Sequence, residues 1–385
     1  MSRISIYIHW PYCLSLCPYC DFNSHIAESI DASVWLEAYK AELKYFYAHI
    51  SGRRVRSVFF GGGTPSLMKP SLVAEIIDFI ADIGIIDVET EITLEANPTS
   101  FEIEKFKDFK AAGINRVSIG VQSLKPESLK ILGRKHSARE AVNAITSAGK
   151  LFENYSFDLI YALPSQTLKA WQEELKAAMD IAGPHISLYQ LTIEKGTPFF
   201  KLYKDKKLIL PSNDAAADMY EYTNEYLNKK NYNRYEISNY ALSGAECVHN
   251  LCYWNYYEYV GIGPGAHSRL HHNNGSIEAL MTYHNPEKWL GKIRLDGNAV
   301  QNRTALSENE IIKEVFMMGT RLEEGINEKY FQKTTGFSFD EVLDSEIVKQ
   351  YIDMNLVIKN QEYIKLSPAG ILLHSYLVPR MLGVL

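Results

Sequence analysis

The chain of 385 residues has few cysteines, no long apolar run and no excess of positive charge. Its 5 cysteines are too few and too unevenly placed for a disulfide framework, so we expect a reducing compartment, the cytoplasm. No apolar run approaches the roughly 20 residues of a membrane-spanning helix, which leaves only peripheral membrane contact. The net charge of -6 lacks the basic excess typical of nucleic-acid-binding proteins, so no nucleic acid is expected as a partner.

The remaining composition, 46% hydrophobic and 22% charged residues, is that of a globular protein able to bury a large core. Short β-branched or aromatic runs alternate with amphipathic stretches in the first half, a pattern typical of parallel strands joined by helices. Strands are predicted at residues 4–8, 55–60, 91–95, 116–121, 156–161 and 185–191. Helices are predicted at residues 34–47, 70–82, 101–112, 138–151 and 168–182, with Gly113 and Gly149 expected at helix ends.

These strand–helix units predict an α/β fold with a partial (β/α)6 TIM-like barrel, and a doubly wound sheet is the alternative. Both folds place ligand-binding residues at the C-terminal ends of the strands. After residue 195 the pattern breaks up. We interpret the later part, including the glycine-rich run at residues 261–265, as lid or edge structure that covers the site.

The last part of the chain shows a new pattern, which predicts an α+β winged-helix-like domain. Its predicted helices span residues 308–322, 327–334 and 339–354, a hairpin spans residues 356–366, and Ser367-Pro368 begins a final helix. Without a basic surface, such a domain is expected to serve packing or partner docking. The predicted domains are therefore a core at residues 1–235, a lid or linker at 236–304 and a C-terminal domain at 305–385.

Three cysteines crowd one loop directly after the first predicted strand, where Cys13, Cys17 and Cys20 form a Cys-x3-Cys-x2-Cys triplet. Thiolates at this spacing can hold a [4Fe-4S] cluster from one side, and a set of three leaves the fourth iron without a protein ligand. Structural zinc is the alternative. Its closed tetrahedral site would need a fourth ligand, for which His9 and His25 are the nearest candidates.

Glycine-rich and polar residues follow the later predicted strands. In Gly61-Gly62-Gly63-Thr64-Pro65 the glycines allow the backbone to approach a ligand closely, although a turn without a ligand would explain them too. Glu95 and Gln122 end the third and fourth strands. Arg134 and Asp158 carry opposite charges suited to a carboxylate and to ribose hydroxyls, and a surface ion pair is the alternative.

The cysteine triplet resembles the cluster loop of the radical S-adenosylmethionine (SAM) superfamily, in which the open iron is chelated by the methionine moiety of SAM. Over nearly the whole chain, the motif series resembles the oxygen-independent coproporphyrinogen III oxidase-like branch of that superfamily. The resemblance implies a barrel of the radical SAM type and a [4Fe-4S] cluster on the three cysteines. Gly263, Gly265 and Ala266 are candidates for a later cofactor contact, and a tight turn would explain the two glycines as well. The SAM-binding residues that it implies are Tyr7, Tyr19, Gly62, Gly63, Thr64, Glu95, Gln122, Arg134 and Asp158.

Two features set the chain apart from the oxidase. Cys20 is followed by Asp21-Phe22, where the oxidase has another cysteine two residues after the third, and Met1 lies too close to the cluster loop for the oxidase's N-terminal extension. The run from Asp21 to His25 instead resembles the HemW family of proposed haem chaperones. The run from His249 to Trp254 matches the His-Asn-x-x-Tyr-Trp signature associated with haem handling in that family.

An imidazole is the usual axial ligand of haem iron, so His249 is the candidate haem ligand, and Tyr253 and Trp254 could pack on the macrocycle. A hydrogen-bonded core histidine is the alternative, and Cys247 and Cys252 are alternative ligands. The resemblance implies a radical SAM-type haem chaperone that delivers haem to haem-accepting proteins, including membrane-associated respiratory ones, and leaves a homodimer open. The alternative function is oxygen-independent oxidation of coproporphyrinogen III.

Overall fold

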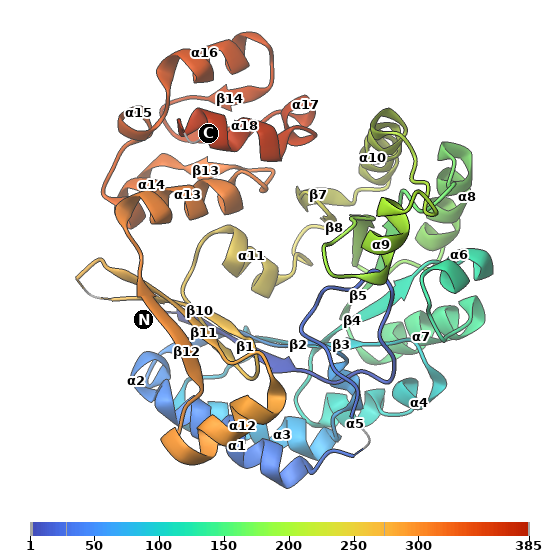
Figure 1. The fold of residues 1–385 in the computed structure, drawn as a ribbon, viewed down its shortest axis with the longest axis vertical. Coiled ribbons are helices and arrows are strands. Elements are labelled where there is room, and N and C mark those ends of the chain that lie inside the picture. Colours follow the sequence, from blue (N-terminus) through green and yellow to red (C-terminus); the bar gives the residue numbers. More distant parts are fainter. Residues whose placement is uncertain (1–2, 28, 273, 384–385) are drawn as a thin grey trace.

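The computed structural model describes residues 3–27, 29–272 and 274–383, and its described residues form one 12-stranded sheet and a smaller C-terminal module (Figure 1). The strand order is β12-β11-β10-β9-β1-β2-β3-β4-β5-β6-β8-β7. Strands β1 to β6 are parallel, and β9 runs parallel to β1 on its other side. The strands are β1 (Arg3–Trp10), β2 (Arg54–Gly62), β3 (Glu91–Ala96), β4 (Arg116–Gln122), β5 (Asn154–Tyr161), β6 (His185–Gln190), β7 (Asn233–Glu236), β8 (Asn239–Ala241), β9 (Tyr259–Ile262), β10 (His267–His271), β11 (Ile277–Thr282) and β12 (Val300–Ala305).

Helices cover the outer face of this curved sheet (Figure 1). The longer helices bury residues three and four positions apart. Helix α7 begins at a capping box formed by Ser137 and Glu140, whereas α3 begins with Pro70 in its first turn and has no side-chain cap. The helices of this part of the chain are α1 (Ala32–Tyr45), α2 (Tyr47–Ile50), α3 (Pro70–Ile83), α4 (Ser100–Ile103), α5 (Phe106–Ala111), α6 (Pro126–Ile131), α7 (Ala138–Leu151), α8 (Leu168–Met179), α9 (Pro198–Lys204), α10 (Asn213–Asn228) and α12 (Pro286–Asp296), with a short η1 (Pro65–Leu67). Helix α9 lies at the mouth of the barrel rather than on its outer face.

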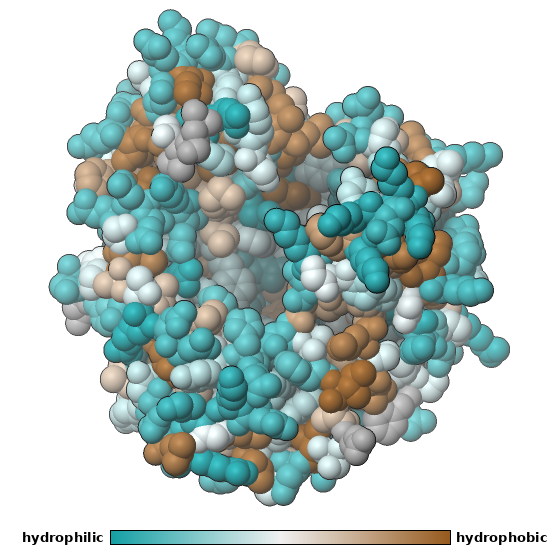
Figure 2. All heavy atoms as spheres, in the orientation of Figure 1, coloured by the Kyte–Doolittle hydropathy of each residue, from teal (hydrophilic) through white to brown (hydrophobic). Residues whose placement is uncertain are grey.

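The predicted partial barrel is confirmed, because the parallel strands curve without closing and leave a concave inner face. Figure 2 shows the molecule hollowed between the C-terminal module and the side of the sheet that carries α9. The single helix predicted at residues 101–112 is instead α4 and α5. Gly149 does not end a helix but lies inside α7, where an added Cβ would meet the Tyr155 hydroxyl at 2.8 Å.

Residues 236–304 are built into the sheet more closely than a lid or linker would be. Strand β9 pairs with β1 in the middle of the sheet, and β10, β11 and β12 extend it as antiparallel edge strands. Helix α11 (Val248–Trp254) lies on the concave side, which the crossover helices leave free (Figure 1). This part of the chain therefore completes the wall of the barrel and partly fills it.

The C-terminal module consists of helices and a small antiparallel sheet, as the winged-helix-like prediction requires. Phe316, Phe331 and Phe339 form its aromatic centre, with ring centroids 5.0–5.9 Å apart. The Arg321 guanidinium joins the module to the barrel, since it lies 4.3 Å from the Trp254 ring and pairs with Glu236 at 3.1 Å. Its elements are α13 (Glu308–Gly319), β13 (Ile326–Asn327), α14 (Glu328–Thr335), α15 (Phe339–Val342), α16 (Ser345–Asp353), β14 (Val357–Lys359), β15 (Tyr363–Leu366), α17 (Pro368–Ile371) and α18 (His374–Met381).

No helix in the described part of the chain combines the length and the hydropathy that crossing a membrane would need.

Candidate functional site

The loop that carries the three cysteines leaves the sheet after β1 and is held in place by backbone hydrogen bonds. The Cys13 N–H donates to the His25 carbonyl (2.9 Å), and the His25 N–H donates to the Pro11 carbonyl (2.7 Å). At the start of α9, the Phe199 N–H donates to the Pro18 carbonyl (2.9 Å). The loop is therefore fixed both to itself and to the far side of the barrel mouth.

Side-chain donors reach the thiols of Cys13 and Cys17. Thr64 Oγ1 donates to Cys13 Sγ (3.4 Å), and Arg134 Nη1 donates to Cys17 Sγ (3.5 Å). Asn97 joins these two donors, because its Nδ2 donates to Thr64 Oγ1 (3.1 Å) and its Oδ1 accepts from Arg134 Nη2 (2.6 Å). Residues that follow β2, β3 and α6 thus position the cysteine loop.

The three thiols fit the donor set of an iron-sulfur cluster. All three cysteines are partly exposed, and hydrogen bonds to the sulfurs are one means by which proteins tune such clusters. Burial raises the pKa of the Cys13 thiol and raises the pKa of Cys20 to about 11, so metal binding there has to displace protons. The residues present can hold the group, since each thiolate binds a different iron of the cube.

Zinc fits this loop less well. Among the described residues, no three His, Cys, Asp or Glu side chains converge as a single metal ion requires. The two histidines considered as a fourth ligand are also engaged elsewhere. His9 Nδ1 pairs with Tyr7 Oη (3.0 Å) and His9 Nε2 with the Asn23 carbonyl (2.9 Å), while His25 Nε2 pairs with Asn23 Oδ1 (3.0 Å).

The glycine-rich end of β2 packs directly against the start of the cysteine loop. An added Cβ on Gly62 would lie 2.5 Å from the His9 ring and 2.8 Å from the Trp10 carbonyl oxygen, and Gly62 has a φ of +114°. An added Cβ on Gly63 would lie 2.7 Å from the Tyr12 carbonyl oxygen. Glycine is therefore required here for the two strand ends to meet, whether or not a ligand also contacts this backbone.

Five predicted polar residues come from four parallel strands and the loop after α6: Glu95 and Gln122 at or next to the ends of β3 and β4, Tyr7 and Asp158 further back on β1 and β5, and Arg134 after α6. We call them the strand-end set. Glu95 Oε2 accepts a hydrogen bond from the Gly62 N–H (3.2 Å), and Arg134 Nη2 donates to the Gly120 carbonyl (2.7 Å). The fold thus brings together residues that are far apart in the sequence.

The two carboxyl groups of the strand-end set are poorly solvated. Burial raises the pKa of Glu95 to about 8, and the neighbouring Asp158 adds to the effect. Burial likewise raises the pKa of Asp158 to about 6, against hydrogen bonds from Ser187 and Ser118 that lower it. Such carboxyl groups favour a cationic or hydrogen-bonding ligand that restores the solvation lost on folding.

Gln122 has the left-handed backbone conformation that non-glycine residues rarely adopt, with a φ of +68° at a bulge in β4. Its side-chain amide lies beside Gly120, where an added Cβ would be 3.0 Å from Gln122 Nε2. Strained residues of this kind are enriched at binding sites, where the surroundings hold them in place. The conformation presents Gln122 to the same strand ends as Arg134.

A cavity of about 470 Å³ opens beside the strand-end set, and we call it the mouth cavity. Tyr7, Gly62 and Glu95 line it, so three of the predicted SAM-binding residues face one space. Its described lining includes no Lys or Arg side chain. The other lining residues are His9, Phe22, Asn23, Tyr253, Tyr259, Gly265, Ala266, His267 and His284.

Only some of the remaining predicted cofactor contacts lie at the mouth cavity. Gly265 and Ala266 line the mouth cavity. Gly263 has a structural role, since its N–H donates to the buried Glu42 carboxylate (2.8 Å) and an added Cβ would lie 2.5 Å from the His9 carbonyl oxygen. Tyr19 packs near the α9 side of the loop, with its ring centroid 6.2 Å from that of Phe199.

His249, the predicted haem ligand, lies on α11 and is almost fully enclosed, with 1% of its surface exposed. Its Nδ1 pairs with Ser57 Oγ (2.8 Å), its Nε2 pairs with Tyr253 Oη (2.9 Å), and its ring stacks on Phe59 at 5.0 Å. Burial lowers the pKa of His249 to about 3, so the imidazole is neutral. Both ring nitrogens are engaged, and Tyr253, the partner of Nε2, lines the mouth cavity whereas His249 does not. Its role as an iron ligand stays a prediction.

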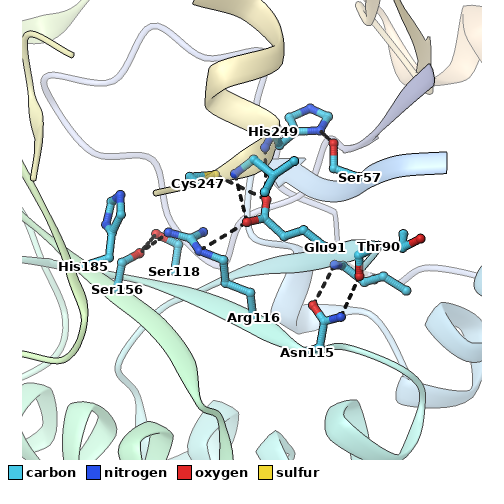
Figure 3. A network of polar contacts seen from close by, with 12 residues as sticks. Ser57, Thr90, Glu91, Asn115, Arg116, Ser118, Ser156, His185, Cys247 and His249 are labelled. Atoms are coloured by element: carbon cyan, nitrogen blue, oxygen red, sulfur yellow. Dashed lines mark hydrogen bonds and ion pairs between the residues drawn. The ribbon is translucent and has the colours of Figure 1, made fainter. Parts of the chain in front are cut away.

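A network of polar side chains, the inner network, fixes α11 to the floor of the barrel (Figure 3). The Glu91 carboxylate accepts from the backbone N–H groups of Val248 (3.0 Å) and His249 (3.1 Å) and from Cys247 Sγ (3.5 Å). Arg116 is 3.9 Å from Glu91 and is 2% exposed. A carboxylate from β3 therefore satisfies the N–H groups that begin α11.

The two further cysteines are structural in this fold. Burial raises the pKa of the Cys247 thiol to about 12, and Cys252 is fully buried with Sγ 3.8 Å from the Tyr257 and Glu258 carbonyl oxygens. Neither thiol reaches the mouth cavity. The arrangement matches buried, weakly hydrogen-bonding cysteines rather than metal ligands.

Sequence reasoning missed Glu91, Arg116 and Asn97. Glu91 and Arg116 begin strands, where a charged residue is usually a solvated end, and only the placement of α11 shows that they are buried. Asn97 could have been identified from the sequence. It directly follows the third strand, in a run that also contains Glu95, and polar residues at that position face the barrel mouth.

Comparisons with known proteins agree with this architecture. The family described as the Radical SAM superfamily matches residues 7–178, and the family described as the HemN C-terminal domain matches residues 306–373. The solved structure of coproporphyrinogen III oxidase (HemN) from Escherichia coli superposes with a TM-score of 0.83 at 20% identity, over 99% of this chain and 90% of that chain. At that identity the likeness shows the shared fold.

Curated relatives are closer in sequence. The heme chaperone HemW of Haemophilus influenzae is 36% identical over 376 residues, which cover 96% of this chain and 95% of the relative. The heme chaperone HemW of Escherichia coli is 35% identical over 357 residues, covering 91% and 92%. The mitochondrial radical S-adenosyl methionine domain-containing protein 1 of Danio rerio is 39% identical over 332 residues, covering 85% and 75%.

Proposed function

The chain belongs to the HemW family of the radical SAM superfamily, and from this premise we propose that it binds haem and delivers it to haem-accepting proteins. The observation that carries the proposal is the match to heme chaperones along more than nine tenths of both chains, which includes both the barrel and the C-terminal module. The fold shared with the oxidase does not distinguish a haem chaperone from a coproporphyrinogen oxidase. Phe22 favours the chaperone, because it stands where the oxidase has a further cysteine.

We propose that Cys13, Cys17 and Cys20 hold a [4Fe-4S] cluster and that SAM occupies the adjoining part of the mouth cavity. When bound, the reduced cluster supplies an electron that cleaves a carbon-sulfur bond of SAM. The SAM-binding residues in this proposal are Tyr7, Tyr19, Gly62, Gly63, Thr64, Glu95, Gln122, Arg134 and Asp158. The geometry that supports it is the convergence of these residues beside the cysteine loop.

Within this site, the residues of the chain bind and orient rather than react. Thr64 and Arg134 donate hydrogen bonds to two cysteine sulfurs, and Asn97 keeps both donors in place. Glu95 is suited to accept a hydrogen bond from an ammonium group, because burial has removed the water that would otherwise solvate its carboxylate. Gln122 and Asp158 extend the same polar surface to the next strands.

Delivery requires partners, which we propose to be cytoplasm-facing apo-haemoproteins, including membrane-associated respiratory ones. No disulfide joins any of the five cysteines, all of which lie in the described part of the chain, and this arrangement is compatible with a reducing compartment. The C-terminal module offers a docking surface for such partners. Peripheral membrane contact and a homodimer are compatible with the proposal but not needed for it.

The proposal is tested by titrating the anaerobically reconstituted protein with haem and following the Soret band. We expect saturable binding, followed by transfer of the haem to an added apo-haemoprotein. The triple variant Cys13→Ala, Cys17→Ala, Cys20→Ala is the control for the cluster, and it should lose the brown colour. If haem binds without saturation, or never leaves for the acceptor, the chaperone proposal fails.

The oxidase alternative is tested with the same preparation. Incubation with SAM, a reductant and coproporphyrinogen III should give no protoporphyrinogen, even under conditions that cleave SAM. Formation of that product in amounts above one per protein would replace the chaperone proposal with an oxidase.

A further inference from the structure

Three buried glutamates on helices hold the loops that follow strands of the sheet. Each has at most 2% of its surface exposed, and each carboxylate accepts a hydrogen bond from a backbone N–H at a strand end. Such bonds offset part of the solvation that a buried carboxylate loses. The pairs are Glu42 of α1 with Gly263 after β9 (2.8 Å), Glu174 of α8 with Leu124 after β4 (2.8 Å) and Glu102 of α4 with Asn97 after β3 (2.8 Å).

Glu102 joins the loops after two neighbouring strands. Its Oε2 accepts from the Asn97 N–H and also from the hydroxyl of Ser66, which lies in η1 just after β2. Its Oε1 accepts from Thr99 Oγ1 (3.2 Å). One carboxylate therefore fixes the end of β2 against the end of β3.

These two loops carry or connect the donors to the cysteine sulfurs. Thr64, two residues before Ser66, donates to Cys13 Sγ (3.4 Å). Asn97 connects this donor to Arg134, which donates to the second cysteine of the loop (3.5 Å). Asn97 alone thus separates the buried carboxylate from both donors.

We propose that Glu102 is a positioning residue for the iron-sulfur cluster, because it fixes Thr64 and Arg134 against the cysteine sulfurs and thereby raises the reduction potential of the cluster. The inference rests on the proposed cluster and adds the residue that holds its sulfur donors in place. Hydrogen bonds to the sulfurs stabilise the reduced cluster, so donors that move away should lower the potential.

Two other roles of Glu102 would give different results. A carboxylate that acts through its negative charge stabilises the oxidised cluster, so its removal would raise the potential. A carboxylate that only stabilises the fold would change the melting temperature and leave the potential as it is.

The test is a redox titration of the full-length, anaerobically reconstituted protein, followed by electron paramagnetic resonance of the reduced cluster. Glu102→Leu removes every acceptor, so the potential should fall. Glu102→Gln keeps an oxygen that can accept from Ser66 and Asn97, so its potential should stay close to that of the wild-type protein. A rise of the potential in both variants would show a charge effect and overturn the inference.

The matched control is Glu174→Leu. Glu174 is also a buried helix carboxylate that accepts from a serine hydroxyl, Ser123 Oγ (2.5 Å), and from the next backbone N–H. Its two donors follow β4, whereas Thr64 and Asn97 follow β2 and β3. Both Leu variants should lower the melting temperature, but only Glu102→Leu should lower the potential.

A smaller change keeps the test valid if Glu102→Leu loses its fold or its cluster. Ser66→Ala removes only the hydroxyl that joins η1 to Glu102, so the potential should fall by less. Ser123→Ala removes the corresponding hydroxyl from Glu174 and should leave the potential unchanged. If Glu102→Leu holds no cluster, equal potentials in the two Ala variants overturn the inference.

The outcomes separate the inference from the proposed function. If the wild-type protein reconstitutes no tetranuclear cluster, both the proposed cluster and the role of Glu102 are overturned. If it holds the cluster but Glu102→Leu has the wild-type potential, the cluster stands and the inference is wrong. A fall in Glu174→Leu as large as that in Glu102→Leu would also overturn it.

Discussion

The inner network and the strand-end set lie on the same concave face of one sheet, yet they use similar residues for different ends. On β3, Glu91 and Glu95 are four residues apart and point to the same side. Glu91 accepts hydrogen bonds from the first N–H groups of α11 and lies beside Arg116. Glu95 accepts one from the backbone of Gly62, and burial raises its pKa to about 8.

The difference between the two groups shows how one barrel can be stable and still bind a ligand. Where the chain supplies the partners of buried polar groups, as around Glu91, the groups fix the fold. Where it leaves them partly unpaired, as around Glu95, the groups favour a ligand. Substitutions in the inner network should therefore change stability most, and substitutions in the strand-end set should change ligand binding most.

The largest effect is expected for Arg116→Met. This change leaves the Glu91 carboxylate buried without its cation, which should lower the free energy of unfolding by about 3–5 kcal/mol. Denaturant unfolding followed by circular dichroism measures the loss. Arg139→Met on α7 is the control, because this exposed arginine should give a change within about 0.5 kcal/mol. Equal losses in both variants would show that the inner network does not stabilise the fold.

The next effect concerns Tyr253→Phe, which removes the hydroxyl that pairs with His249 Nε2. A buried nitrogen without its partner should cost about 1–3 kcal/mol of unfolding free energy. The haem Kd is measured on the same variant. The exposed Tyr376→Phe should change neither quantity.

The same variant tests His249 as the haem ligand. If His249 is the axial ligand, Tyr253→Phe frees its Nε2, and haem binding should become tighter. That result would place the haem iron beside the mouth cavity, which Tyr253 lines. It would also make α11 a gate rather than a fixed part of the barrel.

Much of the fold could be predicted because it follows from local patterns. The strands from β1 to β6 and the helices between them have clear hydrophobic periods, and the predicted bounds differ from the observed ones by a few residues. The role of residues 236–304 could not be predicted in this way. Strand β9 is four residues long, and it joins the sheet only because it pairs with β1 from the other end of the barrel sequence.

For the site too, the residues that follow from local patterns could be predicted, and those that depend on distant packing could not. The strand-end set could be predicted, since parallel strands bring their C-terminal ends to one edge whatever their separation in sequence. The inner network could not, because Glu91 and Arg116 become buried only when α11 is placed on the concave face. His249 was singled out by its motif alone, and a motif does not show that both ring nitrogens already have partners.

The stability of the folded protein should depend on pH through Glu95, and the Glu95→Gln variant should lack this dependence. The pKa of Glu95 is raised from 4.5 to about 8 by burial, so its protonated form is favoured in the folded state. Its contribution to stability is full below pH 4.5 and is lost as the pH rises through 8. Between these values, the melting temperature of the cluster-free wild-type protein should fall relative to that of Glu95→Gln.

Binding completes that comparison. Glu95→Gln should weaken SAM binding while its stability at pH 8 equals or exceeds that of the wild-type protein. A variant that is less stable at pH 8 and binds SAM normally would place Glu95 with the inner network instead.

The smallest effect on stability is expected for Thr64→Val, which keeps the shape of the side chain and removes the hydroxyl that donates to Cys13 Sγ. The unfolding free energy should change by about 1 kcal/mol, as for the loss of one ordinary hydrogen bond. The reduction potential of the reconstituted cluster should fall, because a sulfur without this donor stabilises the oxidised state. Thr146→Val on the exposed side of α7 tests the same replacement away from the cluster, and it should leave the potential unchanged. A potential that is equal in both variants would mean that Thr64 positions the loop through Asn97 without acting on the sulfur.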